Sequence, residues 1–363
     1  MSDLKNKITE SVNQIIDKDL GKTLGELNSI QEIIVTDNAI QVNIELIQPI
    51  QWIYAEIKKQ IKRILEDLAS AYKHEIFINE KPINLTNRRT LKGVKNLIAV
   101  ASGKGGVGKS TIAANIAAGL KRQGATVGIL DADVYGPSQP TMFDLEGRKL
   151  MAVQTQDGKS AAIPIEQYGV KVASMGFIMN KEEAAIVRGP MLAGYFSMLF
   201  EQVEWGDLDF LIFDLPPGTG DIQLTLVQKI PLTGAVIVTT PQDIALADVR
   251  RSIAMFQKTK VEILGIVENM SYFTPPELPD NKYYIFGEGG GKRIADEFNV
   301  NLLGEVPLDL EMREATDSGR PVILNSQETP HNKAIKAVID NIVRETRLIN
   351  HKNSAIAIPN ISI

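Results

Sequence analysis

The sequence predicts an α/β protein in which a doubly wound, mostly parallel sheet follows a small α/β domain. From residue 96 onward, short apolar runs alternate with helix-like stretches, which is the pattern of buried parallel strands joined by helical crossovers. The composition is that of a globular chain, with 44% hydrophobic and 23% charged residues. At 363 residues, the chain is long enough for two domains with separate cores.

Residues 1–80 are expected to form the small α/β domain. Apolar residues recur there at helical spacing in two stretches, and β-rich runs flank an Asp37-Asn38 turn. The expected elements are a helix over Leu4–Ile16, a hairpin of Ile30–Val35 and Ile40–Leu46, an amphipathic helix over Trp52–Leu68 and a strand over His74–Asn79.

A polar and basic stretch, residues 81–95, carries no sustained periodicity and is expected to be a linker. Residues 96–350 then form the larger domain, and residues 351–363 a flexible tail. The buried strands of the larger domain are expected at Leu97–Ala101, Val127–Leu130, Val170–Ala173, Phe210–Phe213, Ala235–Thr239, Ile263–Val267 and Leu302–Val306.

Charge and composition exclude several classes of function. A net charge of −5 and a pI of about 5.5 do not favour nucleic acid as a partner. Neither a run of 18 uncharged apolar residues nor a signal-peptide pattern is present, so we expect no membrane span and a cytoplasmic location. The chain has no cysteine, which rules out disulfides, thiolate nucleophiles and thiolate-bound metal clusters within it.

The stretch GKGGVGKS, residues 103–110, matches the phosphate-loop pattern G-x-x-x-x-G-K-[ST] between a predicted strand and a helix expected over Thr111–Lys121. Glycines let backbone N–H groups turn toward phosphate oxygens, and the helix N-terminus adds positive charge. Lys109 is expected to reach the β- and γ-phosphates of ATP, and the Ser110 hydroxyl to bind Mg²⁺. The expected nucleotide-binding residues of this loop are Gly103, Lys104, Gly105, Gly106, Val107, Gly108, Lys109, Ser110 and Thr111.

Two acidic clusters follow apolar strands. Asp131 and Asp133 end one strand, and Asp214 closes another in the arrangement that holds Mg²⁺ through water. Ligands of open α/β sheets bind outside the carboxyl ends of the strands, so we expect these acids to converge on the phosphate loop. The metal-binding residues that these patterns predict are Ser110 and Asp214.

Lys104 is a second lysine in the loop. One triphosphate carries about four negative charges, more than one lysine neutralises, and a lysine at the loop's start is better placed to reach a facing subunit than its own phosphates. KGGVGKS resembles the signature KGGVGK[ST] of the deviant Walker A ATPases, the MinD/ParA class. This resemblance implies a homodimer that encloses two ATP molecules, with Lys104 crossing the two-fold interface.

The same resemblance implies roles for further residues. Asp133 would orient the attacking water, and Asp131 would support the Mg²⁺ shell. Gly218, in a switch loop, would sense the γ-phosphate. Asn269 resembles the adenine-contacting asparagine of the family, and Val306–Leu308 its adenine-side loop. The catalytic residues implied are Lys104, Lys109 and Asp133.

Longer motifs resemble one branch of this class, the Mrp/ApbC branch. They are DADVYGPSQP (131–140), VRGPM (187–191), FDLPPGTGD (213–221), TTPQDIALADVRR (239–251), ENMSYF (268–273) and GEGGG (287–291). IIDKDLGKTLGEL (15–27) resembles a small domain often fused to the branch. The resemblance implies slow ATP hydrolysis, binding and transfer of iron–sulfur clusters, and iron–sulfur assembly proteins or apoprotein clients as partners.

One position departs from this branch. A C-x-x-C motif usually follows N-M-S-x-x-x and bridges a cluster across the dimer, but Pro275 and Leu278 stand at those two places here. Neither can ligate iron. The three histidines, His74, His331 and His351, lie elsewhere in the sequence. The residues therefore argue against a conventional cluster site, and the cluster function follows from the resemblance alone.

Three functions stay open at this point. The first is an Mrp-type ATPase that serves iron–sulfur assembly, with a partner supplying the thiolates. The second is a MinD/ParA-like switch that recruits a protein partner, with its ATPase as a timer. The third is a DNA- or membrane-positioning ATPase, against which the acidic pI and the lack of a basic amphipathic tail weigh.

Overall fold

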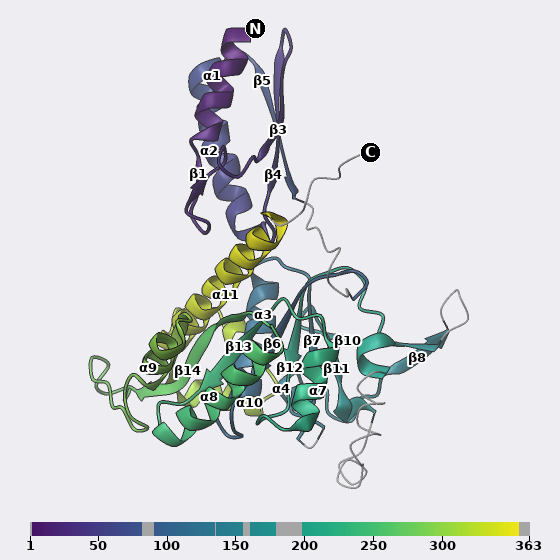
Figure 1. Ribbon diagram of the computed structural model, residues 1–363, viewed down its shortest axis with the longest axis vertical. Coiled ribbons are helices and arrows are strands. Elements are labelled where there is room, and N and C mark those ends of the chain that lie inside the picture. The colour runs from purple at the N-terminus through teal and green to yellow at the C-terminus, as the bar shows by residue number, and fades with distance from the viewer. Residues whose placement is uncertain (1, 82–90, 135, 155–159, 179–197, 356–363) are drawn as a thin grey trace. The chain divides into compact units, whose positions relative to one another are not determined.

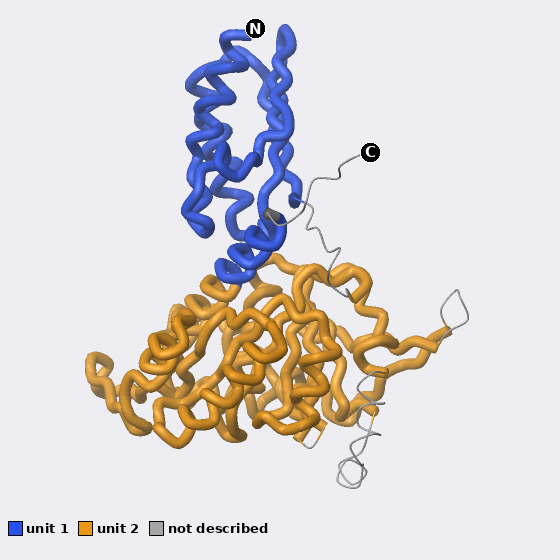
Figure 2. The backbone as a smooth tube through the Cα atoms, in the orientation of Figure 1, with its two compact units in different colours: residues 1–86, 343–363 blue, residues 87–342 orange. Residues whose placement is uncertain are grey.

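The computed structural model of the protein describes residues 2–81, 91–134, 136–154, 160–178 and 198–355. It divides into two compact units (Figure 2): unit 1 comprises residues 1–86 and 343–363, and unit 2 residues 87–342. Most of the expected linker, the motif VRGPM and residues 356–363 of the expected tail lie outside the described residues. The domain boundaries expected from the sequence stay predictions.

Unit 1 contains a three-stranded sheet in the order β3-β4-β5, with β3 antiparallel and β5 parallel to β4. Burial alternates along β4, and helix α2 adds an apolar stripe that includes Ile53, Ile57 and Ile61. These side chains share one core, so one face of the sheet is buried against helix. The elements are α1 (Ser2–Asn13), β1 (Ile16–Asp17), β2 (Lys22–Thr23), β3 (Ile30–Val35), β4 (Ala39–Leu46), α2 (Gln51–Ala69) and β5 (Lys73–Glu80).

The end of the chain completes unit 1 through a buried charge pair. Helix α11 (Pro330–Ala355) contributes its residues from 343 onward, so the helix includes the first residues of the expected tail. Arg347 and Asp17 are both fully buried, and the guanidinium binds both carboxylate oxygens, with Nη1 2.9 Å from Oδ1. Arg347 Nε also donates to the carbonyl of Ile47 at 3.1 Å. The pair thus satisfies polar atoms that burial would otherwise leave without partners.

Unit 2 contains an eight-stranded sheet in the order β10-β11-β7-β12-β6-β13-β14-β15. Its neighbouring strands are parallel except for the edge pair β10 and β11, which confirms the predicted mostly parallel sheet. The elements are β6 (Val94–Ala101), α3 (Lys109–Arg122), β7 (Val127–Asp131), α4 (Gln139–Met142), β8 (Met151–Gln154), β9 (Ser160–Ile163), β10 (Ile165–Gln167), β11 (Val170–Ser174), η1 (Met175–Phe177), β12 (Leu208–Asp214), α7 (Asp221–Lys229), β13 (Gly234–Thr239), α8 (Asp243–Lys258), β14 (Ile263–Phe273), α9 (Gly290–Phe298), β15 (Leu302–Leu308), α10 (Leu310–Asp317) and η2 (Val322–Leu324).

Helices cover both faces of this sheet. Figure 1 shows α8 and α9 in front of the sheet and α3 behind it. Apolar residues of α7, α8 and α9 share a core with every second residue of β6, including Leu97 and Ala99. With both faces covered, the open edge of the sheet at the carboxyl ends of its strands is where polar loops gather. Among the helices that the structure describes, none is long and apolar enough to cross a membrane.

Candidate nucleotide-binding site

The loop between β6 and α3 has the geometry of a phosphate cradle. Gly106 (φ 79°) and Gly108 (φ 76°) adopt left-handed conformations that disfavour side chains with a β-carbon. At Gly103 a β-carbon would collide with the backbone of Asp248 in α8, so this glycine permits a close approach of the helix. Gly108 is the N-cap of α3. The loop therefore presents backbone N–H groups and the positive end of a helix to an anion.

Lys109, Ser110 and Asp214 meet at the carboxyl ends of β6 and β12. The Lys109 ammonium forms an ion pair with Asp214 Oδ1 and lies 3.2 Å from Ser110 Oγ. Both charged side chains are buried, Asp214 completely. The sheet register places Asp214 directly beside Asp131 of β7. The fold thus gathers the loop lysine and two predicted metal-binding acids at one edge of the sheet.

Gln139, the first residue of α4, belongs to the same cluster, although its only signal in the sequence is its place in the motif DADVYGPSQP. Its fully buried side-chain amide donates to Asp214 Oδ2 at 2.8 Å and to the Ser110 carbonyl at 3.1 Å. One side chain therefore connects the phosphate loop to the acid of β12. Such a contact orients a carboxylate without itself touching a metal ion.

Asp131 is fully buried, and both of its carboxylate oxygens accept hydrogen bonds from protein. The donors are the N–H groups of Asp133, Ser138 and Gln139 and the hydroxyl of Ser174, at 3.0 or 3.1 Å. Burial, together with the neighbouring carboxylate of Asp214, raises the pKa of Asp131 to about 7. In this structure Asp131 fixes the loop that follows β7 and leads into α4.

The two remaining phosphate-side residues lie on loops. Asp133 lines an open pocket together with Pro217, and its Oδ1 accepts the N–H of Gly136 at 3.2 Å. Gly218 (φ 96°) donates its N–H to the Ser102 carbonyl, next to the phosphate loop, at 3.0 Å. The structure therefore ties the loop after β12 to the start of the phosphate loop.

Lys104 lies near the start of the phosphate loop and is half-buried. Its carbonyl accepts the Ser102 hydroxyl at 2.9 Å, which fixes the backbone of the loop at this point. Among the residues that the structure describes, none makes a hydrogen bond or ion pair with the Lys104 ammonium.

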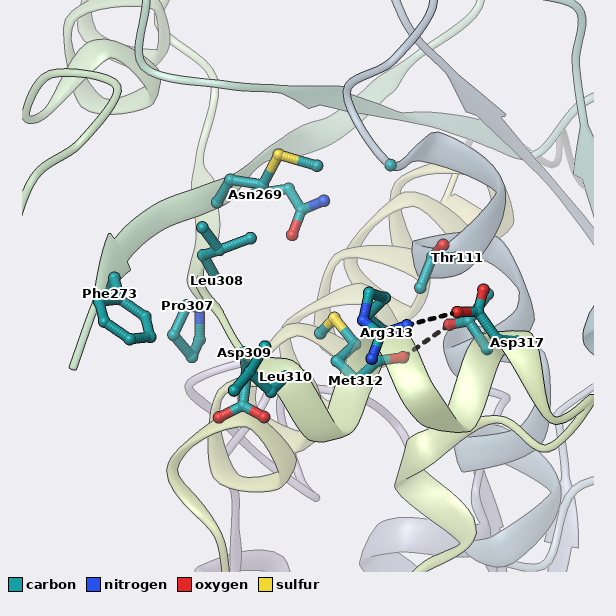
Figure 3. Close-up of a pocket in the computed structure, with 13 residues that line it drawn as sticks. Thr111, Asn269, Phe273, Pro307, Leu308, Asp309, Leu310, Met312, Arg313 and Asp317 are labelled. Atoms are coloured by element: carbon teal, nitrogen blue, oxygen red, sulfur yellow. Dashed lines mark hydrogen bonds and ion pairs between the residues drawn. The ribbon is translucent and has the colours of Figure 1, made fainter. Parts of the chain in front are cut away.

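A pocket of about 360 Å³ lies beside Gly108 and Thr111 (Figure 3). Asn269 reaches it because β14 becomes irregular there, with Met270 in the left-handed region at φ 53° and a register shift against β15. The Asn269 amide donates to the Val107 carbonyl at 2.9 Å, whereas its buried Oδ1 accepts no hydrogen bond from any residue that the structure describes. The rest of the lining is Phe273, Pro307, Leu308, Asp309, Leu310, Met312, Arg313, Thr316 and Asp317.

Pro275 and Leu278, which stand at the two cysteine positions of the expected C-x-x-C motif, lie in the loop after β14. Phe273 and Tyr283 exchange two backbone hydrogen bonds of 2.9 and 2.8 Å, which close the loop. The N–H of Leu278 donates to the Pro275 carbonyl at 3.0 Å, and the Leu278 side chain is 48% exposed. The loop therefore brings the two positions into one turn without offering a thiolate there.

The family described as NUBPL iron-transfer P-loop NTPase, of the ParA group, matches residues 93–343. The chain is 45% identical over 331 residues to the iron-sulfur cluster carrier protein of Synechocystis sp., covering 90% of this chain and 93% of that protein. It is 47% identical over 274 residues to the iron-sulfur cluster transfer protein NUBPL of Dictyostelium discoideum, covering 75% and 84%. A nucleotide-binding protein of Archaeoglobus fulgidus, solved with ADP, superposes with a TM-score of 0.57 at 39% identity, covering 66% of this chain and 91% of that chain.

Proposed function

Because the chain belongs to the NUBPL iron-transfer family of P-loop NTPases, we propose that it binds and slowly hydrolyses Mg·ATP and serves the transfer of iron–sulfur clusters to apoproteins. The ATPase part rests on one observation: the buried Lys109 ammonium contacts both Asp214 and Ser110 beside the glycine loop. The cluster-transfer part is supported by the names of the two relatives, which match 90% and 75% of the chain.

The pocket beside the loop fits an adenine base. Its walls are largely apolar, and Asn269 supplies one buried acceptor, Oδ1, that has no hydrogen-bond partner among the described residues. The exocyclic amine of adenine is a donor that satisfies such an atom, whereas the carbonyl of guanine or hypoxanthine is not. We therefore expect ATP to bind about tenfold more tightly than ITP, which lacks the amine.

At the phosphate end, the chain's own groups must rearrange. Lys109 leaves Asp214 to pair with phosphate oxygens, and the freed carboxylate and the Ser110 hydroxyl then face the metal position. When bound there, Mg²⁺ neutralises charge on the phosphates. Asp133, at the mouth of the pocket that it shares with Pro217, is placed to orient water. Asp131 supports the set by holding the loop on which Asp133 lies.

A homodimer is part of this proposal. The Lys104 ammonium has no bonding partner among the described residues. In a dimer, the phosphates of the nucleotide bound to the facing chain would be its partner. In that arrangement each active site contains one lysine from its own chain and one from the facing chain.

Substitution of Lys109 by Ala tests the nucleotide site. We expect the affinity for a fluorescent ATP analogue to fall by about 100-fold, because the loss removes the buried cation that faces the phosphates. Lys292→Ala, which removes an exposed lysine of α9, is the matched control and should leave the affinity unchanged. Nucleotide binding by Lys109→Ala at the level of the parent would show that the site is elsewhere.

Cluster transfer needs thiolates that this chain does not contain. A partner protein therefore has to supply them, and the ATPase would act by binding that partner or the apoprotein. The test follows activation of an apo-enzyme by a cluster-loaded donor, with and without the chain and Mg·ATP. Faster activation that needs both the chain and ATP supports the proposal, and equal rates in all arms contradict it.

The lack of cysteine also favours a second candidate function, a nucleotide switch that recruits a protein partner without any link to iron. The two candidates differ in one result. A switch would capture its partner in the ATP state and leave the rate of cluster transfer in the donor assay unchanged.

A further inference from the structure

A second group of metal-ligating side chains lies at the start of α10, at the edge of the base pocket. Asp309, Glu311 and His331 each place one ligand atom within 4.8 Å of the others. His331 is 1% exposed, whereas both carboxylates remain open to solvent on one side. All three residues belong to unit 2. None of them is part of the phosphate-binding cluster around Lys109.

The ring of His331 is held in the orientation that a metal ligand needs. Its Nε2 lies 2.8 Å from Thr329 Oγ1, and in the tautomer that carries the proton on Nε2 the ring donates to that oxygen. Its Nδ1 is buried, has no hydrogen-bond partner in the part of the chain that the structure describes, and lies 3.2 Å from Asp309 Oδ2. In that tautomer Nδ1 carries no proton and its lone pair faces the carboxylate oxygen, so a cation between the two atoms, a proton or a metal ion, relieves the contact.

Both carboxylates are oriented by a backbone or side-chain amide. Asp309 Oδ1 accepts the N–H of Glu311 at 2.8 Å, which leaves Oδ2 toward the ring. Glu311 Oε1 accepts the side-chain amide of Asn325 at 2.9 Å, and its Oε2 lies on the ring side, 3.5 Å from His331 Nε2. Hydrogen bonds of this kind fix the first ligands of protein metal sites.

We propose that Asp309, Glu311 and His331 bind one divalent first-row transition-metal ion through Asp309 Oδ2, Glu311 Oε2 and His331 Nδ1. Ligand distances of about 2.1 Å put neighbouring ligand atoms about 3 to 4 Å apart, and the pair Asp309 Oδ2 and His331 Nδ1 already has that spacing. Rotation of the solvent-facing Glu311 side chain completes the set. One imidazole and two carboxylates suit Zn²⁺, Co²⁺, Mn²⁺ or Fe²⁺ better than Mg²⁺, which prefers oxygen ligands and water.

The experiment titrates the full-length, chelator-treated protein with Co²⁺ and with Zn²⁺, without nucleotide and with Mg²⁺ in large excess. Calorimetry gives stoichiometry and affinity, and the visible spectrum of Co²⁺ reports its ligands. We expect one ion per chain, with binding weakened more than about tenfold in Glu311→Gln and in Asp309→Asn. His74→Gln and His351→Gln are matched controls that remove the other two histidines of the chain and should not change the affinity.

His331→Gln should abolish binding. Because His331 is buried, this variant is judged only alongside Glu311→Gln, whose solvent-facing side chain keeps the acceptor for Asn325. Absence of saturable binding in the parent overturns the proposal. So does binding that survives both carboxylate substitutions, or that disappears in a control variant.

Discussion

At the scale of single residues, the site depends on which charges have partners inside the chain. Lys109 is paired with Asp214, whereas Lys104 has no bonding partner among the described residues. For Lys109 to bind phosphate, its buried ion pair with Asp214 has to break, and breaking this pair away from water costs free energy. We expect the bound nucleotide to offset that cost, and we predict that the two lysines of the loop act at different stages.

Lys104 is predicted to act on the nucleotide of the facing chain. Lys104→Ala should bind ATP but fail to dimerise or to hydrolyse, and Asp133→Ala should bind ATP without turnover. Mixing the two variants should restore part of the ATPase activity, because the Asp133→Ala chain lends its lysine to the site of the other chain. A steady-state ATPase assay across mixing ratios measures this recovery. No activity at any ratio, with mixed dimers shown by mass, contradicts action across the interface.

Gln139 is predicted to position Asp214. Gln139→Leu keeps the side-chain volume and removes both hydrogen bonds, so the concentration of Mg²⁺ needed for half-maximal ATPase activity should rise by about tenfold. The affinity for nucleotide without Mg²⁺ should stay near that of the parent. Titration of activity with Mg²⁺ and of binding in EDTA separates the two effects. An equal loss in both assays would point to a general packing defect instead.

Residue types predicted this cluster only in part. The glycine spacing and Lys109 indicated a phosphate loop, and the sheet register explains why Asp214 and Asp131 lie together. The saturation of Asp131 by four donors depends on the course of the loop after β7, which the apolar pattern does not encode. The role of Gln139 could not be predicted either, because a single glutamine belongs to no spacing pattern and its position depends on the same loop.

At the scale of elements, the start of β12 connects three strands. Asp209 accepts the Lys95 ammonium of β6 at 2.8 Å, and the N–H and hydroxyl of Thr126, just before β7, at 2.8 and 2.9 Å. Burial alone would raise the pKa of Asp209, but the hydrogen bonds from Lys95 and Thr126 outweigh it and hold that pKa below its ordinary value. The ionised carboxylate therefore stabilises the centre of the sheet.

Asp209→Asn should lower the free energy of unfolding at pH 7 by about 2 kcal/mol. Since the pKa of Asp209 is lower in the folded state, its contribution is complete above the unfolded value of about 3.9 and declines as the pH falls through the folded value. The gap between parent and variant should thus narrow below about pH 4. Urea unfolding from pH 7 to 3.5 measures this, with Asp207→Asn, at an exposed position, as the control. A gap that is constant with pH would exclude a role for the ionised form.

Elements with strong apolar patterns were predictable and the others were not. The runs from Leu97 to Ala101 and from Phe210 to Phe213 lie within β6 and β12, because buried parallel strands leave little room for polar residues. Strand β14 extends beyond the expected Val267 because Glu268, Asn269 and Ser271 are buried with polar contacts of their own. The short strands β8, β9 and β10 lack a long apolar run, so the pattern did not indicate them.

At the scale of the whole molecule, cluster chemistry depends on residues that this chain lacks. We expect the purified protein to stay colourless after anaerobic incubation with iron and sulfide, because no thiolate is present. The measurement is iron and acid-labile sulfide per dimer, together with the visible spectrum. The acid-labile sulfide content distinguishes an iron–sulfur cluster from a single iron ion bound by carboxylates and imidazole. A stoichiometric cluster in the unmodified chain would contradict this expectation.

Placing cysteines at both Pro275 and Leu278 should create a cluster shared by two chains. The turn that joins these residues already brings the two positions together, as the hydrogen bond from Leu278 to Pro275 shows. The control pair is Pro276→Cys with Pro279→Cys, which has the same spacing shifted by one residue. Iron, sulfide and dimer mass are measured for both variants. A cluster in both would mean that spacing alone, and not this turn, determines assembly.

Unit 1 is predicted to depend on the end of the chain. Arg347→Ala leaves Asp17 buried without its partner and should lower the free energy of unfolding of this unit by about 3 to 5 kcal/mol. Lys352→Ala changes a neighbouring cation of the same helix and serves as the control. Hydrogen exchange followed by mass spectrometry reads the strands of unit 1 separately from those of unit 2. Unchanged protection of β4 in Arg347→Ala would contradict the prediction.

The pairing of Arg347 with Asp17 also limits how unit 1 can be transferred to another gene by recombination. A contiguous segment cut at the expected linker would lack the arginine that neutralises its buried acid, since residues 87–342 separate Asp17 from Arg347 in the sequence. Recombination that transplants only the first 80 residues should therefore yield a poorly folding product unless the recipient brings its own cation. In a series of C-terminal truncations, we expect unit 1 to lose its folded structure in variants that still hydrolyse ATP.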